Sequence, residues 1–182
     1  MQSSRHLTTD SPGTCNKAYV YWSFPEQKPS IEEYNRLNNV TSAQESDVGD
    51  IPEDTPKQIK ALDERALNEG KMVGKWMIFV SPDEINEIWA DICELVDNKM
   101  FWLAKASTNW ARKKKQYDKH AVFVYTPNYL DIDDIKRVRN VLREECGFTD
   151  DLQYKTDYYA HLGIYPDTIS EWDVETEARY NF

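Results

Sequence analysis

The feature that most constrains the fold of this chain is a strand–helix–strand pattern that occurs twice in succession within residues 71–165. In the first unit, residues 76–80 are a compact apolar run, as expected of a buried strand. The sequence Ser-Pro-Asp-Glu follows and supplies an N-cap, a first-turn proline and a capping-box glutamate, so we predict that a helix starts at Ser81. Apolar side chains then recur at the spacing of one helix face, with Trp89 in the core, before residues 100–106 form a second strand.

The second unit repeats this plan. Residues 121–125 are a strand, Asp131 can cap a helix that Gly147 closes, and residues 152–165 return as extended structure. Two such units are compatible with a doubly wound parallel sheet, with a ferredoxin-like split strand–helix–strand plan, and with a larger antiparallel sheet that carries helices on one face. Periodicity alone leaves these architectures open.

The remaining segments differ in composition from these two units. Residues 1–16 and 39–57 are polar and rich in turn-forming residues, and we predict that both are flexible because they bury too little apolar area to offset chain entropy. Residues 17–165 are predicted to form a single domain, followed by an acidic C-terminal tail over residues 166–182. Two further elements are predicted outside the repeated units, a short strand in residues 18–24 and a helix over residues 57–69.

The charge of the chain limits what it can bind. With 22 basic and 32 acidic side chains, the formal net charge is −10, which argues against sequence-independent binding to duplex DNA because that requires many neutralised phosphates. The charge is uneven, however, and residues 71–119 hold nine basic and seven acidic side chains, a balance of +2. This middle part is where a phosphate group is expected to bind.

The sequence offers little support for catalysis or for a cofactor. Its three cysteines are widely separated and lack CxxC spacing, so neither a disulfide framework nor a metal site is expected. Motifs such as GxSxG, HExxH, a Walker loop and GxGxxG do not occur, which favours a binding protein over an enzyme. Because no apolar run approaches the ~20 residues of a membrane span and no signal peptide is recognisable, we expect no membrane association and a cytoplasmic location, with RKKK at residues 112–115 also compatible with the nucleus.

Several ordered motifs within residues 71–165 resemble one known family. They are GKWMIFV, EIWADI, LAKAST, HAVFVYTPNYLD, RVRNVLRE and YKTDYYAHLGIY. Together they are similar to the little-characterised eukaryotic family typified by the basophilic-leukaemia-expressed protein. That family is similar in fold to the cap-binding translation initiation factor of the 4E type, so the resemblance implies an α+β fold in which a curved antiparallel sheet carries helices on one face. Binding of RNA or of a nucleotide is implied only by analogy of fold.

Three lysines on the predicted strands are the first candidates for a ligand site. Lys75, Lys105 and Lys155 each lie in or beside a strand that otherwise looks core-facing, where a lysine without a partner is rare. They would hold a phosphate or carboxylate on a concave sheet face, and Ser107 would add a hydroxyl donor. The alternative is that each lysine points to solvent under the two-residue alternation of its strand.

A second candidate is the only basic run of the chain. Arg112, Lys113, Lys114 and Lys115 are predicted on a loop between two strands, with Trp110 and other aromatic residues interleaved. Cations that contact the backbone and rings that accept any base suit a single-stranded nucleic acid, so we expect a salt-sensitive contribution to RNA binding. A solvated loop without a ligand is the alternative.

A third candidate is the aromatic string near residue 160. If residues 152–165 are one strand, Lys155, Tyr159, His161 and Tyr165 share a face by parity and form a polar aromatic floor. Ordinary sheet tyrosines with hydrated hydroxyls are the alternative.

Three functions remain open at this point. The first is an RNA- or nucleotide-binding protein that uses these lysines and stacking aromatic residues. The second is a protein-interaction module without a small ligand, in which the acidic tail and residues 39–57 engage a basic partner. The third is a phosphate-ester hydrolase that uses His161 with an acidic neighbour.

Overall fold

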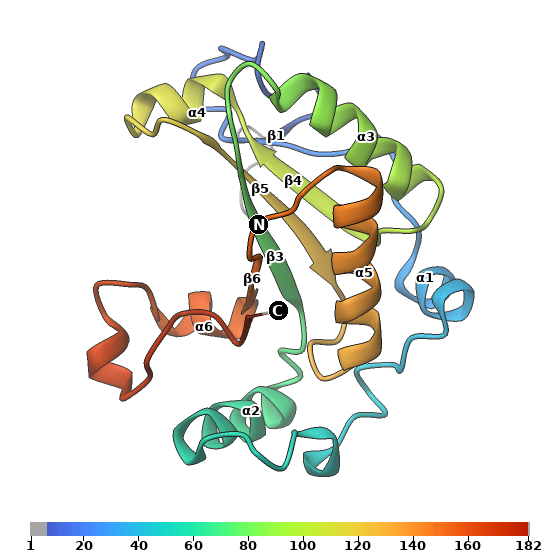
Figure 1. Ribbon diagram of the computed structural model, residues 1–182, viewed down its shortest axis with the longest axis vertical. Helices are drawn as coiled ribbons and strands as arrows, with labels where there is room; N and C mark the ends of the chain where they lie inside the picture. Colours follow the sequence, from blue (N-terminus) through green and yellow to red (C-terminus); the bar gives the residue numbers. More distant parts are fainter. Residues whose placement is uncertain (1–6, 182) are drawn as a thin grey trace.

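The computed structural model describes residues 7–181 and has a curved seven-stranded sheet with helices (Figure 1). The strand order is β1-β2-β4-β5-β3-β6-β7, and every neighbouring pair is antiparallel except β1 and β2. The strands are β1 Leu7–Thr8, β2 Trp22–Ser23, β3 Gly74–Val80, β4 Leu103–Ser107, β5 His120–Thr126, β6 Gln153–Thr156 and β7 Tyr180–Asn181. This arrangement confirms the predicted α+β class with an antiparallel sheet and excludes the doubly wound alternative.

The helices are α1 Ile31–Asn38, α2 Lys57–Glu69, α3 Ile85–Asp97, α4 Asn109–Lys114, α5 Ile132–Glu145 and α6 Asp157–Leu162. Two short 3-10 turns are η2 Val48–Asp50 and η3 Ile169–Trp172. In Figure 1, α3 and α5 lie on one side of the sheet, and α6 with the C-terminal segment lies on the other. Among the residues described, no helix is both long and apolar enough to pass through a bilayer.

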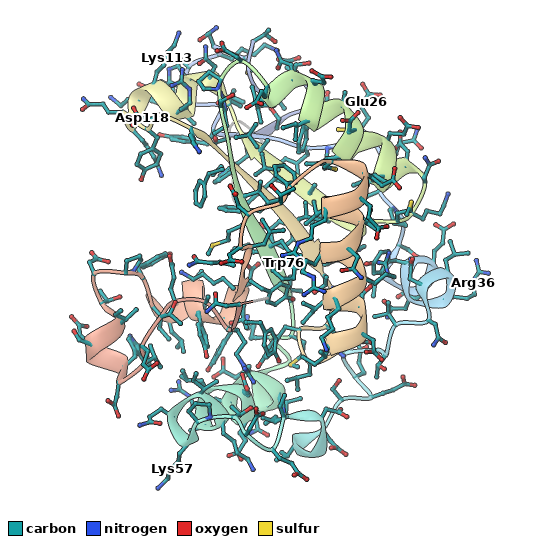
Figure 2. The ribbon with its side chains drawn as sticks, viewed as in Figure 1. Glu26, Arg36, Lys57, Trp76, Lys113 and Asp118 are labelled. Atoms are coloured by element: carbon teal, nitrogen blue, oxygen red, sulfur yellow. The ribbon has the colours of Figure 1, made fainter. Side chains whose placement is uncertain are left out.

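The main core lies between the sheet and the pair α3 and α5. Alternate residues of β3 face this core, so Trp76, Ile78 and Val80 are buried against apolar side chains of both helices. The indole Nε1 of Trp76 donates a hydrogen bond to the carbonyl of Ile135 at 3.2 Å, which satisfies a polar group that burial would otherwise make costly (Figure 2). Trp89 is buried in the same core, as predicted.

The helix boundaries agree with the sequence in two cases and differ in one. Gly70, in the left-handed region at φ 64°, ends α2, and the Asp131 side chain caps α5 by accepting from the Asp134 amide. By contrast, α3 begins at Ile85 and not at the predicted Ser81. The Ser81 hydroxyl donates to the Glu84 carboxylate, so these two side chains bond to each other and do not form a capping box.

The two segments predicted to be flexible contain local structure. Of residues 1–16, the first six lie outside the described part of the chain, β1 includes residues 7 and 8, and Cys15 is buried. Within residues 39–57, Asp47 caps η2 by accepting from the Gly49 amide, and Ile51 is buried. Their mobility stays a prediction.

The acidic segment after residue 165 folds back onto the domain. Its strand β7 pairs with β6, so the segment covers that edge of the sheet. Arg179 is buried and forms an ion pair of 2.8 Å with Asp63 of α2. Tyr129 also donates a hydrogen bond to Asp63, which ties three distant parts of the chain together.

Candidate ligand-binding cleft

The face of the sheet opposite α3 and α5 carries the three predicted lysines. In β3, the residues between the core positions are Lys75, Met77 and Phe79. Register places Lys75 opposite Lys155 of β6 on one side and opposite Tyr125 of β5 on the other. Lys105 of β4 lies opposite Phe123 of β5. The structure therefore brings the three lysines to one sheet face, as the strand alternation predicts.

A cleft of about 700 Å³ lies on this face. One of its walls is formed by residues that follow α4, and the other by residues of α6 and the segment after it. The lining residues are Trp22, Lys75, Met77, Phe79, Lys115, Tyr117, Asp118, Lys119, Ala121, Phe123, Lys155, Ala160, Tyr165, Pro166 and Glu177. In Figure 1, α4 and α6 lie toward opposite ends of the open side of the sheet. We call this site the concave cleft.

Lys105 lies beside the concave cleft in an aromatic environment. Its Nζ is 4.4 Å from the centroid of the Trp22 ring and 5.5 Å from the centroids of Phe123 and Tyr125. Within residues 7–181, no carboxylate forms an ion pair with it. Burial, and secondly the charge of Lys75, lowers the pKa of Lys105 from its ordinary value to about 8. Among the described residues, Lys105 thus has no carboxylate in direct contact, and Asp157 favours its charged form only from a longer distance.

The other two lysines already have carboxylate partners. Lys75 donates to Asp157, the first residue of α6, and Lys155 donates to Glu177 of the C-terminal segment and to the carbonyl of Ile164 at 2.7 Å. The Lys155 side chain is only 2% exposed, whereas that of Asp157 is 44% exposed. Burial lowers the pKa of Lys155, against the effect of Glu177. Lys155 therefore holds the C-terminal segment in place, whereas Lys75 is paired with a more exposed carboxylate.

The prediction of a continuous strand over residues 152–165 is wrong. β6 ends at Thr156, whose hydroxyl caps α6 by accepting from the Tyr159 amide at 3.1 Å. Helical geometry turns Tyr159 into a core position, where it is 1% exposed, so it does not line the cleft. His161 is exposed and its ring stacks on Tyr158 at 6.2 Å. Of this predicted floor, Lys155 and Tyr165 are among the cleft residues, with Nζ 4.2 Å from the Tyr165 centroid.

The basic run is helical and not a loop. Thr108 caps α4 by accepting from the Ala111 amide, and Lys115 follows as its C-cap. Arg112 donates to the carbonyl of Tyr117, so it fixes the turn after the helix. Lys115 lines the concave cleft, whereas Lys113 and Lys114 are exposed on α4 and are not among its lining residues. Figure 2 shows Lys113 and Asp118 at the tip formed by α4 and this turn.

The two remaining predicted residues do not line the concave cleft. Ser107 is buried and its hydroxyl accepts from the Ala121 amide at 2.9 Å. Trp110 packs edge-on against Tyr21 at 5.0 Å and is not among the cleft residues. The aromatic residues that do line it include Phe79 and Phe123, which were not predicted from the sequence although they lie on the same sheet face as Lys75 and Lys105.

The geometry gives no support for metal chemistry or for a histidine–carboxylate pair. No group of three His, Cys, Asp or Glu side chains within residues 7–181 is placed to hold a metal ion. Among the hydrogen bonds of the described residues, none joins His161 to a carboxylate, so the acid–base pair required by the hydrolase hypothesis is not formed. What the cleft offers is cations, aromatic rings and space.

Comparison with known protein families shows to which family the chain belongs. Residues 21–163 match the model of the family described as basophilic leukemia-expressed protein Bles03. Because this match covers well over half of the sequence, the chain belongs to the Bles03 family. No curated protein matches it.

Solved structures with a similar fold include three cap-binding complexes. An eIF4E-3 of Ascaris suum with an m2,2,7G cap is 13% identical, with a TM-score of 0.38, over 47% of this chain and 51% of that one, so the chain spans about half its length. The C. elegans eIF4E-3 in complex with the 4E-binding protein Mextli and a cap analog is 11% identical, with a TM-score of 0.45. The match covers 89% of this chain and 94% of that one. A schistosome eIF4E with m7GpppA and 4E-BP is 12% identical, with a TM-score of 0.46. The match covers 83% of this chain and 80% of that one. Likeness at this level concerns the fold and does not transfer a ligand.

Proposed function

We propose that this protein binds a nucleotide unit, free or at the end of a single-stranded RNA, in the concave cleft. The observation that carries the proposal is Lys105, a cation without a carboxylate partner in the described chain, stacked over Trp22 beside a cleft of about 700 Å³. A phosphate group would supply the missing counter-ion. Small-ligand sites typically occupy roughly 300–1,000 Å³ and combine aromatic walls with a few polar groups, and the concave cleft has this composition.

The rim of the cleft has aromatic rings on which a nucleobase would stack, in addition to the cations that would bind a phosphate. Phe79 is 58% exposed, Tyr117 59% and Tyr165 45%, although aromatic rings usually bury themselves. Exposed rings beside cations are the arrangement that single-stranded nucleic acids use, because each base has a face that can stack. Lys115 and Lys119 lie at the same rim and would contact the backbone.

The proposal is tested by a thermal-shift panel. Inorganic phosphate, nucleoside phosphates, a capped dinucleotide and short RNA oligomers are compared, since a ligand that binds only the folded state stabilises it by roughly 2.7 kcal/mol at a hundredfold excess over its Kd. We expect nucleotides to raise the melting temperature of the parent chain. The Lys105→Met variant should lose this increase, whereas the control Lys60→Met, on the exposed side of α2, should keep it.

The panel also separates the possible sources of the ligand. At equal ligand concentrations, a shift with mononucleotides as large as that with RNA indicates a free nucleotide, and a shift with RNA alone indicates a strand end. Absence of any shift overturns the proposal and favours the protein-interaction module.

A further inference from the structure

We infer that the concave cleft accepts a ligand with one phosphate group, seated at Lys105, and that Asp157 and Glu177 discriminate against a polyphosphate chain. The inference rests on the proposed function and names the class of ligand more narrowly. It follows from how many cations of the cleft remain uncompensated and from where they lie on the sheet.

The charges in and beside the cleft balance those of a single phosphate. Five lysines surround it, namely Lys75, Lys105, Lys115, Lys119 and Lys155. Three carboxylates, those of Asp118, Asp157 and Glu177, lie among them, which leaves a balance of +2. A phosphate monoester carries about −1.5 to −2 at pH 7. A triphosphate would bring roughly twice this charge into the same space and leave the site negative.

The positions of the lysines matter as much as their number. Across the sheet, Lys105 on β4 is followed by Lys75 on β3 and by Lys155 on β6, with β5 between the first two. A phosphate chain that starts at Lys105 and extends along this line reaches each further lysine together with its carboxylate. Close like charges repel, so the second and third phosphates meet Asp157 and then Glu177 without gaining a free cation.

The two ion pairs cannot easily open for the ligand. Lys155 also donates to the Ile164 carbonyl at 2.7 Å, so turning toward a phosphate would break two bonds of a side chain that is 2% exposed. Lys75 is 9% exposed and lies over the Phe123 and Tyr125 rings at 5.3 and 5.6 Å. Breaking either pair would leave a largely buried lysine without its carboxylate, which is more costly than leaving the pair intact.

The test compares adenosine and guanosine mono-, di- and triphosphates by calorimetry at low salt without divalent cations. We expect association constants that fall from mono- to triphosphate for the parent chain. Asp157→Asn should raise the ratio of the triphosphate to the monophosphate constant about tenfold, because a free Lys75 replaces an ion pair. Asp157 is suited to this change because its side chain is 44% exposed and asparagine keeps its shape. The largely buried Lys75 then lacks its carboxylate, so a loss of stability is expected and circular dichroism checks the fold.

Controls and a second variant separate the possible results. Asp167→Asn, an exposed carboxylate outside the set that lines the cleft, should leave the ratio unchanged. Glu177→Gln should act like Asp157→Asn if it folds. A parent chain that prefers triphosphates, or an unchanged ratio in Asp157→Asn, overturns the inference while leaving the proposed function intact. Absence of binding by every nucleotide overturns both, and 5′-monophosphorylated and 5′-triphosphorylated RNA oligomers repeat the comparison for a strand end.

Discussion

At the scale of single residues, Lys105 is a lysine whose surroundings disfavour its protonated, charged form. Burial and the neighbouring Lys75 lower its pKa to about 8, and three aromatic rings surround its Nζ without supplying a counter-charge. A bound phosphate would stabilise the protonated form and raise the pKa again. Protonation of this lysine and binding of the ligand therefore favour each other, and this coupling can be measured.

Ligand affinity is predicted to fall as the pH rises. Below a pH of about 8 the amine is protonated in the free protein, whereas above it each binding event must take up a proton. Linkage then reduces the association constant by about tenfold per pH unit between the pKa values of the free and bound protein. The measurement is calorimetric titration with adenosine monophosphate between about pH 7.5 and 9.5, where its phosphate, with a second pKa of about 6, is almost fully ionised.

The matched variant is Lys105→Arg. A guanidinium stays charged at every pH in this range, so the affinity of the variant should be independent of pH while its low-pH affinity stays comparable. A pH dependence equal to that of the parent would show that another group is responsible.

The sequence predicted on which face of the sheet the lysines lie, but it did not predict the carboxylates with which they form ion pairs. Strand alternation fixes the side of the sheet on which Lys75 and Lys105 project, and it needs only local information. The partner carboxylates are remote, because Asp157 is 82 residues from Lys75 and Glu177 is 22 residues from Lys155. Periodicity carries no information about such pairs.

At the scale of elements, the shift from strand to helix after Thr156 decided which aromatic residues reach the cleft. Tyrosines in succession favour a strand, but a threonine that caps a helix was present, and Gly163 at φ 77° ends the helix seven residues later. The strand interpretation therefore overlooked a short helix that has a start and a stop. Six residues is too few for a recognisable apolar face.

The lysines on α4 and in the turn after it fall into two groups, those that line the cleft and those that do not. Lys115 and Lys119 are lining residues, whereas Lys113 and Lys114 are exposed elsewhere on the same tip. This division supplies a matched pair of double variants with the same change in net charge. Only one of them removes cations from the cleft.

Lys115→Ala with Lys119→Ala is predicted to flatten the salt dependence of binding to a 5′-monophosphorylated RNA oligomer. Each phosphate contact that is lost reduces the log–log slope by ~0.7 for a single strand, so two contacts give ~1.4. Lys113→Ala with Lys114→Ala should leave the slope near that of the parent. Fluorescence titrations over a range of salt concentrations measure both, with circular dichroism as a check on folding. Equal effects of the two pairs would mean that α4 acts only through its overall charge.

At the scale of the whole molecule, the C-terminal segment is part of the domain and not a free tail. Its acidic composition gave no indication of this, because the two groups that anchor it are single residues, Arg179 and Glu177, that pair with side chains far away in the sequence. The antiparallel sheet and the two core helices could be predicted, since both depend on periodic apolar patterns. The return of the chain as β7 could not, because that strand has only two residues.

The pair of Asp63 and Arg179 is the contact through which this segment is fastened to α2. Both side chains are almost fully buried, and Arg179 donates from Nε and from one terminal nitrogen to the carboxylate, at 3.1 and 2.8 Å to the same oxygen. The other oxygen accepts a hydrogen bond from Tyr129 at 3.0 Å and a longer one from Nε of Arg179 at 3.3 Å. Removing one partner leaves the other charge buried without compensation, whereas removing both leaves only polar or apolar groups.

Arg179→Met alone and Asp63→Asn alone are each predicted to lower the free energy of unfolding by about 3–5 kcal/mol, and the double variant by clearly less than the sum. The measurement is urea unfolding followed by tryptophan fluorescence, analysed as a double-mutant cycle. Lys17→Met, which removes one partner of the exposed pair with Asp10, is the control and should change stability little, because solvent screens that pair. Additive losses in the cycle would mean that Asp63 and Arg179 stabilise the fold independently, and that the C-terminal segment is held to the domain mainly by β7 and by Lys155 with Glu177.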